Sequence, residues 1–145
     1  MTKNILFLCT GNTCRSPMAE GFARARFEQL GMDYRAQSAG LQADGSPVNA
    51  KSVFAAKKLY DIDLSHHISR QVTPQMLGQA DLIVTMTVDQ AALLKMLFPQ
   101  MSEKISPISS EGVRDPYGGT EDDYLACAKQ IYNAIEARTE GGAWS

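Results

Sequence analysis

The sequence predicts a single α/β domain, a four-stranded parallel sheet with helices on both faces. Short apolar runs alternate with amphipathic stretches along the chain, a pattern typical of parallel strands joined by right-handed crossovers. The first apolar run, residues 5–8, has no polar interruption, as expected of a strand buried on both faces. Residues 1–145 suit one domain, and they contain no repeat, linker or low-complexity segment.

Short runs and punctuating residues define the elements of the first half. The first helix is expected to start at Ser16-Pro17, with Ser as the cap and Pro at the first helical position, and to stop at Gly31. A polar loop over residues 42–47 follows the second strand. In order, we expect a strand at 5–8, a helix at 16–30, a strand at 34–39, a helix at 48–60 and an extended segment at 68–72.

Capping residues define the second half in the same way. Thr73-Pro74 indicates the start of a small helix, and Thr120 followed by three acidic residues suits the positive end of a helix dipole. In order, we expect a helix from 73 to about 80, a strand at 81–86, a helix at 89–98, a strand at 105–108 and a long helix at 120–138. The glycine-rich tail, residues 139–145, is expected to fray.

Composition and charge exclude several classes of protein. Hydrophobic residues make up 44% of the chain and charged residues 21%, a balance that indicates a folded domain. The net charge of −2 gives no positive field for nucleic acid, so no nucleic-acid partner is expected. No run approaches the ~20 apolar residues of a membrane span, and no secretory leader is visible, so we expect a cytoplasmic protein without membrane contact.

The segment from Cys9 to Ser16 has the features of an anion-binding loop. It lies between a buried strand and a helix start, where successive backbone N–H groups and the helix dipole attract an anion. Arg15 adds a planar fork for two oxygens, and the same field would hold a thiol at Cys9 as thiolate. The residues expected to bind phosphate are Thr10, Gly11, Asn12, Thr13, Cys14, Arg15 and Ser16.

An activated thiol at an anion site predicts covalent phosphoryl transfer to sulfur. Cys9 would attack phosphorus while backbone amides and Arg15 hold the equatorial oxygens. The leaving group needs a proton, and the carboxylic acid of Asp115, in the dipeptide Asp115-Pro116, is the candidate donor. Asp115 would then act as the base that activates water. Alone, the dipeptide would indicate only a turn.

These features together resemble the low-molecular-weight protein tyrosine phosphatases. The motifs occur in order and cover residues 4 to about 138: Cys9-Thr-Gly-Asn-Thr-Cys-Arg-Ser-Pro-Met-Ala-Glu20, then Ser38-Ala39-Gly40, Arg70-Gln71 and Asp115-Pro116. The resemblance implies that Cys9 is the nucleophile, Arg15 the phosphate ligand and Asp115 the general acid. It also implies hydrolysis of protein phosphotyrosine through a cysteinyl-phosphate, with no metal and no organic cofactor.

The resemblance also implies how the loop is supported. Ser16 would hydrogen-bond the Cys9 thiolate, and Asn12 would adopt a left-handed conformation held by Ser38 and His67. Cys14 would form a reversible disulfide with Cys9, although a plain core position for Cys14 is equally open. Phosphate, sulfate or vanadate would occupy the loop in place of a phosphorylated protein. We expect a monomer or weak dimer.

Two departures from the tyrosine-specific pattern leave the substrate open. Thr13 stands where an aliphatic residue is usual, and Tyr117 is followed by Gly118-Gly119 instead of a second aromatic residue. Both features resemble the bacterial branch that removes phosphate from arginine, and a Thr hydroxyl could orient a guanidinium. Tyr117, beside Asp115, is the candidate pocket wall. Phosphotyrosine is the first hypothesis and phosphoarginine the alternative.

Three other functions fit less well. A nucleotide-binding loop would end in Gly-Lys-Ser/Thr, which this loop lacks. A thiol-dependent arsenate reductase of the same fold needs a relay pair of cysteines in mid-chain, but none lies between Cys14 and Cys127, and Cys127 is expected to fill the core. A non-catalytic phosphopeptide-binding module would not need the complete set of Cys9, Arg15 and Asp115.

Overall fold

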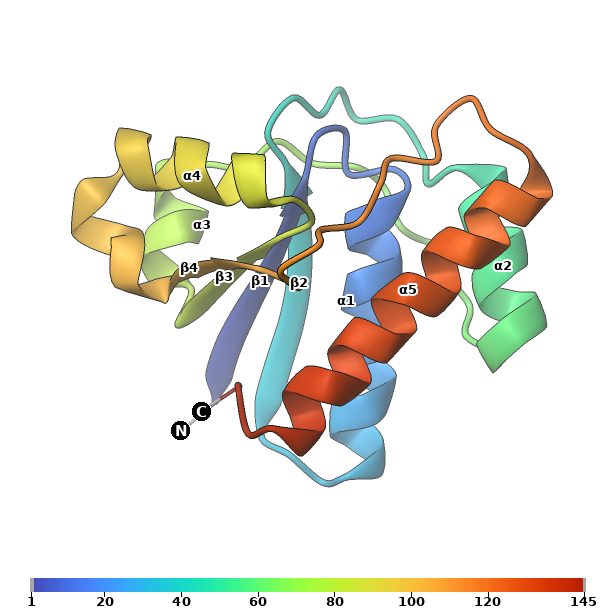
Figure 1. Cartoon of the computed structure of the whole chain (residues 1–145), viewed down its shortest axis with the longest axis horizontal. Helices are drawn as coiled ribbons and strands as arrows, with labels where there is room; N and C mark the ends of the chain where they lie inside the picture. Colours follow the sequence, from blue (N-terminus) through green and yellow to red (C-terminus); the bar gives the residue numbers. More distant parts are fainter. Residues whose placement is uncertain (1, 145) are drawn as a thin grey trace.

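Four parallel strands form the centre of the protein, in the order β2-β1-β3-β4 (Figure 1). The computed structural model describes residues 2–144. The strands are β1 (Lys3–Cys9), β2 (Tyr34–Gly40), β3 (Leu82–Thr85) and β4 (Ile105–Pro107). The chain adds β2 on one side of β1 and then β3 on the other, so the direction of winding reverses at β1. The predicted fold class and four-stranded parallel sheet are confirmed.

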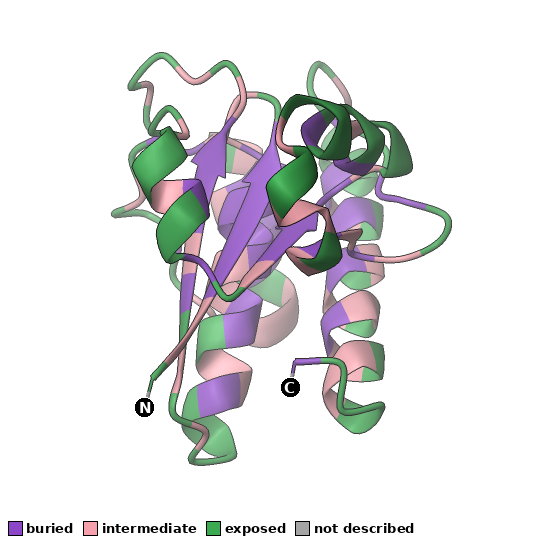
Figure 2. Cartoon of the chain, turned by 90° about the vertical axis from the view of Figure 1, so that its left-hand side faces the viewer, coloured by how far each residue is buried: buried purple, intermediate pink, exposed green. Residues whose placement is uncertain are grey.

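Helices cover both faces of the sheet because side chains of β1 point alternately to either face. Ile5 and Phe7 pack among α1, α2 and α5, whereas Leu6 and Leu8 pack among α3 and α4. Figure 2 shows the strands buried between helices whose outer sides are exposed. The helices are α1 (Arg15–Gln29), α2 (Ala50–Tyr60), α3 (Pro74–Gln79), α4 (Val88–Leu97) and α5 (Glu121–Glu140), with a 3-10 helix η1 (Pro99–Lys104).

The first helix starts differently from the prediction. Its cap position is Cys14, which makes no side-chain capping bond, and Ser16-Pro17 lies inside the first turn. Proline is tolerated there because the first N–H groups of a helix have no intrahelical partner. The prediction that Ser16 caps the helix was therefore wrong, since its hydroxyl is used by Cys9 instead.

The four other α-helices begin at side-chain caps, and at α2 the cap is Asn49, whose side chain accepts from the Lys51 N–H. The Thr73 hydroxyl accepts a hydrogen bond from the Met76 N–H, which confirms the predicted start of α3. Thr120 forms a capping box with Asp123 at the start of α5, as its position before three acids indicated. An unpredicted capping box of Thr87 and Gln90 starts α4. These caps determine how each helix meets the loops at the carboxyl edge of the sheet.

The prediction of a frayed tail was wrong for the part of the tail that the structure describes. Helix α5 continues to Glu140, and Gly142 at φ 69° turns the chain back toward the sheet. Trp144 is only 1% exposed and packs edge-on against Phe7 and Phe27. The last predicted tail residue, Ser145, lies outside the described residues. Within the described part of the chain, no helix combines the length and apolar character needed to cross a membrane.

Candidate active site

The loop between β1 and α1 turns its carbonyl groups outward. Donors outside the loop bind five of its carbonyl oxygens. These pairs are Leu41 N with Cys9 O, Gln42 N with Thr10 O, His67 Nε2 with Asn12 O, Asn49 N with Thr13 O, and Ser52 Oγ with Cys14 O. In a planar trans peptide the N–H points opposite to the preceding C=O, so the N–H groups after these carbonyls face the interior of the loop. The loop therefore has the form of an anion nest, at the point where strand order reverses (Figure 1).

Cys9 ends β1 and lies at the base of this nest. Its Sγ is 2.9 Å from Ser16 Oγ and 3.3 Å from the Asn12 backbone nitrogen, which donates to it. Both contacts hold the sulfur at the base of the loop, where two polar groups can direct hydrogens at it.

Asn12 connects the nucleophile to the rest of the loop. It is fully buried and has a left-handed backbone, with φ at 58°. Its Nδ2 donates to Ser16 Oγ at 2.8 Å and to Ser38 Oγ at 3.0 Å. An amide nitrogen only donates, so Ser16 Oγ must accept from it and is left to direct its own proton toward Cys9 Sγ. The structure thus brings together Asn12, Ser16 and Ser38 in one oriented network.

His67 supports the other side of Asn12. Its Nε2 is 3.1 Å from both the backbone carbonyl and the side-chain Oδ1 of Asn12. Both oxygens accept, so this geometry requires the tautomer with hydrogen on Nε2. The backbone N–H of Arg70 also donates to Asn12 Oδ1, at 3.1 Å. His67 acts here as a structural donor, and the described residues contain no group of three or more metal-ligating side chains.

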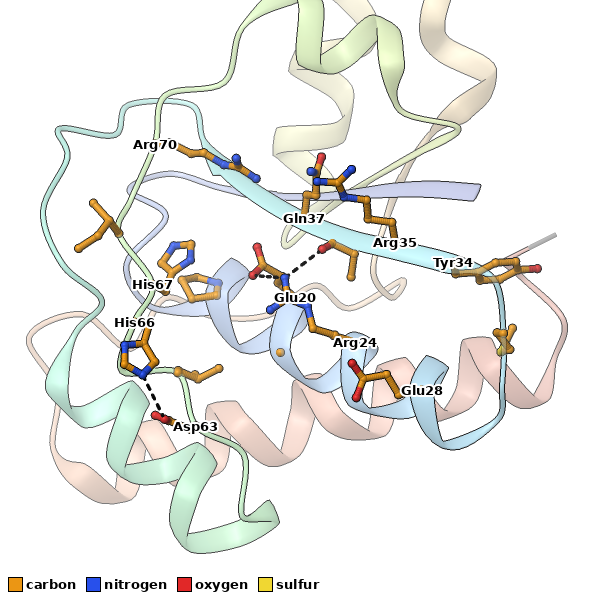
Figure 3. Close-up of a pocket in the computed structure, with 16 residues that line it drawn as sticks. Glu20, Arg24, Glu28, Tyr34, Arg35, Gln37, Asp63, His66, His67 and Arg70 are labelled. Carbon is orange, nitrogen blue, oxygen red and sulfur yellow. Dashed lines mark hydrogen bonds and ion pairs between the residues drawn. The ribbon is translucent and has the colours of Figure 1, made fainter. Parts of the chain in front are cut away.

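Glu20 extends this network and was not predicted as a site residue. Ser38 Oγ donates to Glu20 Oε1 at 2.8 Å, and Arg24 Nη2 is 3.0 Å from Glu20 Oε2. Glu20, Arg24 and His67 line a cavity of about 660 Å³, shown in Figure 3. Glu20 lies four residues after Ser16 on α1, so helical spacing places both on one face. That spacing is the sequence signal from which Glu20 could have been found.

Arg15 and Asp115 meet although 100 positions separate them in sequence. The buried Arg15 donates from Nη1 to the Val113 carbonyl at 2.9 Å, and its Nη2 is 3.6 Å from Asp115 Oδ2. The Asp115 side chain is 50% exposed, and its Oδ1 accepts from the Tyr117 N–H at 3.0 Å. The carboxylate therefore lies beside the guanidinium and is open to solvent. Val113 had no sequence signal, because it contributes only a backbone oxygen.

The residues after Asp115 form a tight turn. Tyr117 is exposed and lines a cavity of about 490 Å³ with Asp115 and Gly118, but no residue of the catalytic loop lines this cavity. Gly118 has a φ of 82°, and a Cβ on Gly119 would come within 2.9 Å of the Pro116 carbonyl oxygen. Backbone geometry thus accounts for both glycines. They are weaker evidence for a particular substrate than the sequence suggested.

Lys51 links this turn to the rest of the protein. Its Nζ donates to the Gly119 carbonyl at 2.6 Å and lies 5.9 Å from the centre of the Tyr124 ring. Lys51 is in the first turn of α2, while Gly119 precedes α5 by two residues. Nothing in the sequence indicated this contact, because the two positions are 68 residues apart.

The other cysteines are buried thiols. Cys14 Sγ lies 3.4 Å from the Tyr124 hydroxyl, and burial raises the pKa of Tyr124, so that phenol stays neutral. Thr13, which is half-buried, has its hydroxyl 3.7 Å from Cys14 Sγ. Burial raises the pKa of Cys127 to about 12, which makes it a poor nucleophile. All three cysteines are free, and Cys127 packs in the core as predicted.

The fold and the site define a class: α/β proteins with a nucleophilic thiol in an anion-binding loop, supported by an arginine and a carboxylate. A family model described as low molecular weight phosphotyrosine protein phosphatase matches residues 4–141. The chain belongs to this family.

Several known proteins are similar to the chain over nearly its whole length. An arsenate reductase of Staphylococcus xylosus is 38% identical, covering 92% of this chain and 94% of its own. The low molecular weight protein tyrosine phosphatase of T. tengcongensis has a TM-score of 0.91 and 36% identity, with coverage of 96% and 99%. The YwlE arginine phosphatase of Geobacillus stearothermophilus has a TM-score of 0.87 and 28% identity, with coverage of 96% and 92%. The relatives thus carry three different activities on one fold.

Proposed function

We propose that the protein hydrolyses phosphotyrosine in proteins through a cysteinyl-phosphate intermediate. The observation that carries this proposal is the position of Cys9 Sγ. It lies within hydrogen-bond distance of Ser16 Oγ and the Asn12 N–H, at the base of a loop whose N–H groups face inward. Such a loop holds a tetrahedral dianion directly above a thiolate. Phosphoryl transfer needs mainly this positioning and charge stabilisation.

In the first step, the Cys9 thiolate attacks phosphorus and the bond from phosphorus to the tyrosine oxygen breaks. Loop N–H groups and Arg15 stabilise the charge on the three equatorial oxygens. Protonated Asp115 donates its proton to the departing phenolate oxygen. The carboxyl of Asp115 reaches this position because its loop brings it to 3.6 Å from Arg15 Nη2.

In the second step, water attacks the phosphorus of the cysteinyl-phosphate. Asp115, now a carboxylate, takes a proton from this water, and the bond between phosphorus and sulfur breaks. Inorganic phosphate leaves, and the Cys9 thiolate and the protonated Asp115 are restored. Half of the Asp115 side chain is exposed, so water can reach it.

One observation favours phosphoarginine as a second candidate substrate. Thr13 places a hydroxyl in the loop, where it could accept a hydrogen bond from a guanidinium. The similarity to YwlE arginine phosphatase is consistent with this candidate. The glycines after Tyr117 do not add to it, since backbone geometry accounts for them.

Arsenate reduction is less well supported, although curated relatives carry that name. The chain has three cysteines and none between Cys14 and Cys127. Cys127 is buried with a raised pKa, so it cannot readily supply a thiolate for a redox relay. A redox relay that passes from Cys9 to Cys14 needs a further thiolate to react with Cys14, and the chain does not supply one.

The test is kcat/KM on matched phosphotyrosine and phosphoarginine peptides, with Cys9→Ser as the blank and Thr13→Ile alongside. We expect a preference for phosphotyrosine that Thr13→Ile leaves unchanged. A preference for phosphoarginine that collapses in Thr13→Ile would assign the second substrate. Arsenate reduction with a dithiol reductant, faster than peptide hydrolysis, would overturn both.

A further inference from the structure

An apolar groove of about 500 Å³ runs beside the catalytic loop. Its walls come from α4, from the segment after β2 and from the segment before α3. Buried Leu77 and Leu94 lie at its base, where they belong to the core on this face of the sheet. The groove is therefore part of the fold's own hydrophobic layer, left open on one side.

The open side of this groove exposes leucine side chains. Leu93 is 44% exposed and Leu97 is 59% exposed, and both line the groove. No charged side chain lines it, although 21% of the chain is charged. Met96 of the same helix is 72% exposed but does not line the groove. A charged occupant would lose its hydration here without finding a partner, so the groove favours an apolar one.

The groove is continuous with the phosphate-binding loop. Thr10, which follows the nucleophile in the chain, lines it, and Thr10 Oγ1 accepts from Gln90 Nε2 at 3.2 Å. Leu41 and Gln42, on the opposite wall, donate their backbone N–H groups to the carbonyls of Cys9 and Thr10. The wall of the groove is thus hydrogen-bonded to the first two residues of the loop.

We propose that this groove binds an apolar side chain of the protein substrate, within two residues of the phosphorylated residue. This inference rests on the proposed phosphatase function and adds a sequence preference to it. An extended chain advances about 3.3–3.6 Å per residue, so a neighbouring side chain lies within reach when the phosphoryl group is over Cys9. The groove then contributes to recognition of a polypeptide and contributes nothing to a small aryl phosphate.

The experiment uses a panel of phosphopeptides that carry Leu, Ala or Glu at each of the two positions on either side of the phosphorylated residue. The panel is built on tyrosine or arginine, whichever the preceding test shows to be hydrolysed. At one position at least, we expect kcat/KM for Leu to exceed that for Glu about tenfold. In the variant Leu93→Ser/Leu97→Ser this ratio falls to near one, while kcat/KM for 4-nitrophenyl phosphate changes less than twofold.

Met96→Ser is the matched control, because it removes an exposed apolar side chain from the same helix outside the groove. We expect it to keep the Leu preference. Equal turnover of Leu and Glu peptides by the wild type, or equal effects of Met96→Ser and the double variant, would overturn the groove assignment alone. No hydrolysis of any phosphopeptide would instead overturn the proposed function. A dimer in sedimentation that dissociates in the double variant would assign the groove to a second copy and overturn the peptide occupant.

Discussion

At the scale of single residues, the site depends on the direction of each hydrogen bond. The Asn12 amide can only donate through Nδ2, which forces Ser16 Oγ and Ser38 Oγ to accept. Ser16 can then donate to Cys9 Sγ, and Ser38 donates to Glu20 Oε1. One buried amide therefore orients two hydroxyl protons, one toward the nucleophile and one away from it.

The orientation of the Ser16 hydroxyl toward Cys9 Sγ predicts the effect of Ser16→Ala. The substitution removes the hydrogen bond at 2.9 Å from Cys9 Sγ. A hydrogen bond to a charged group contributes about 1.5–3 kcal/mol, so we expect kcat/KM to fall about 10- to 100-fold. The measurement is kcat/KM for 4-nitrophenyl phosphate. Ser102→Ala, at a half-buried serine of η1, should leave it unchanged. A loss of less than about threefold in Ser16→Ala would show that the hydroxyl of Ser16 does not stabilise the reacting sulfur.

At the scale of elements, strand β2 approaches the catalytic loop closely. The register places Gly40 opposite Cys9, and a Cβ on Gly40 would come within 2.8 Å of the Thr10 carbonyl oxygen and 3.1 Å of the Asn12 Cβ. Neither neighbour is the end of a flexible side chain. The absence of a side chain at Gly40 therefore allows the loop to pack on β2.

We expect Gly40→Ala to displace the loop. Stability should fall by about 1–3 kcal/mol in urea unfolding, as for an overpacked core position. Vanadate inhibition should weaken with it, because the loop is the anion site. Gly78→Ala in α3 is the control: nothing lies within 4 Å of its added Cβ, and alanine is the better helix former, so stability should hold or rise. Wild-type vanadate affinity in Gly40→Ala would contradict this packing argument.

The contact between α2 and the turn after Asp115 gives a prediction about the general acid. Lys51→Met keeps an unbranched side chain at this position but removes the hydrogen bond to the Gly119 carbonyl and the charge near the Tyr124 ring. A less restrained turn positions Asp115 less well, so kcat/KM should fall about three- to tenfold for phosphates with poor leaving groups. Activated aryl phosphates need little help from an acid and should be nearly unaffected.

Lys58→Met is the matched control for this experiment. Lys58 lies on the same helix and also covers an aromatic ring, Phe54, but Phe54 is exposed, and Lys58 makes no hydrogen bond to the turn. We expect Lys58→Met to change kcat/KM to the same extent for phosphates with good and with poor leaving groups. Equal losses for good and poor leaving groups in Lys51→Met would mean that Lys51 only stabilises the fold.

At the scale of the whole molecule, the sequence predicted what local chemistry determines. Uninterrupted apolar runs marked β1 and β3, and Thr73 and Thr120 marked helix starts, because caps act within one turn. The loop from Cys9 to Arg15 was predictable because strand, loop and helix are consecutive. Glu20, Lys51 and the Val113 carbonyl were not predicted as parts of the site. Two of these depend on contacts between distant segments, and a backbone oxygen has no residue signature.

The packing of the tail is another contact between distant segments that the sequence did not predict. Trp144 lies with its ring 6.0 Å from that of Phe7 and 5.5 Å from that of Phe27, while its Nε1 donates to Thr139 Oγ1. Trp144→Ala should destabilise the protein by about 3–5 kcal/mol, as for other buried aromatic residues, and Trp144→Phe by less. Unfolding must be followed by circular dichroism, since the chain has one tryptophan. The tail lies at the opposite end of the sheet from the catalytic loop (Figure 1), so kcat/KM measured well below the melting temperature should be unchanged. A loss of stability below about 1 kcal/mol would mean that the tail does not hold the ring in the core.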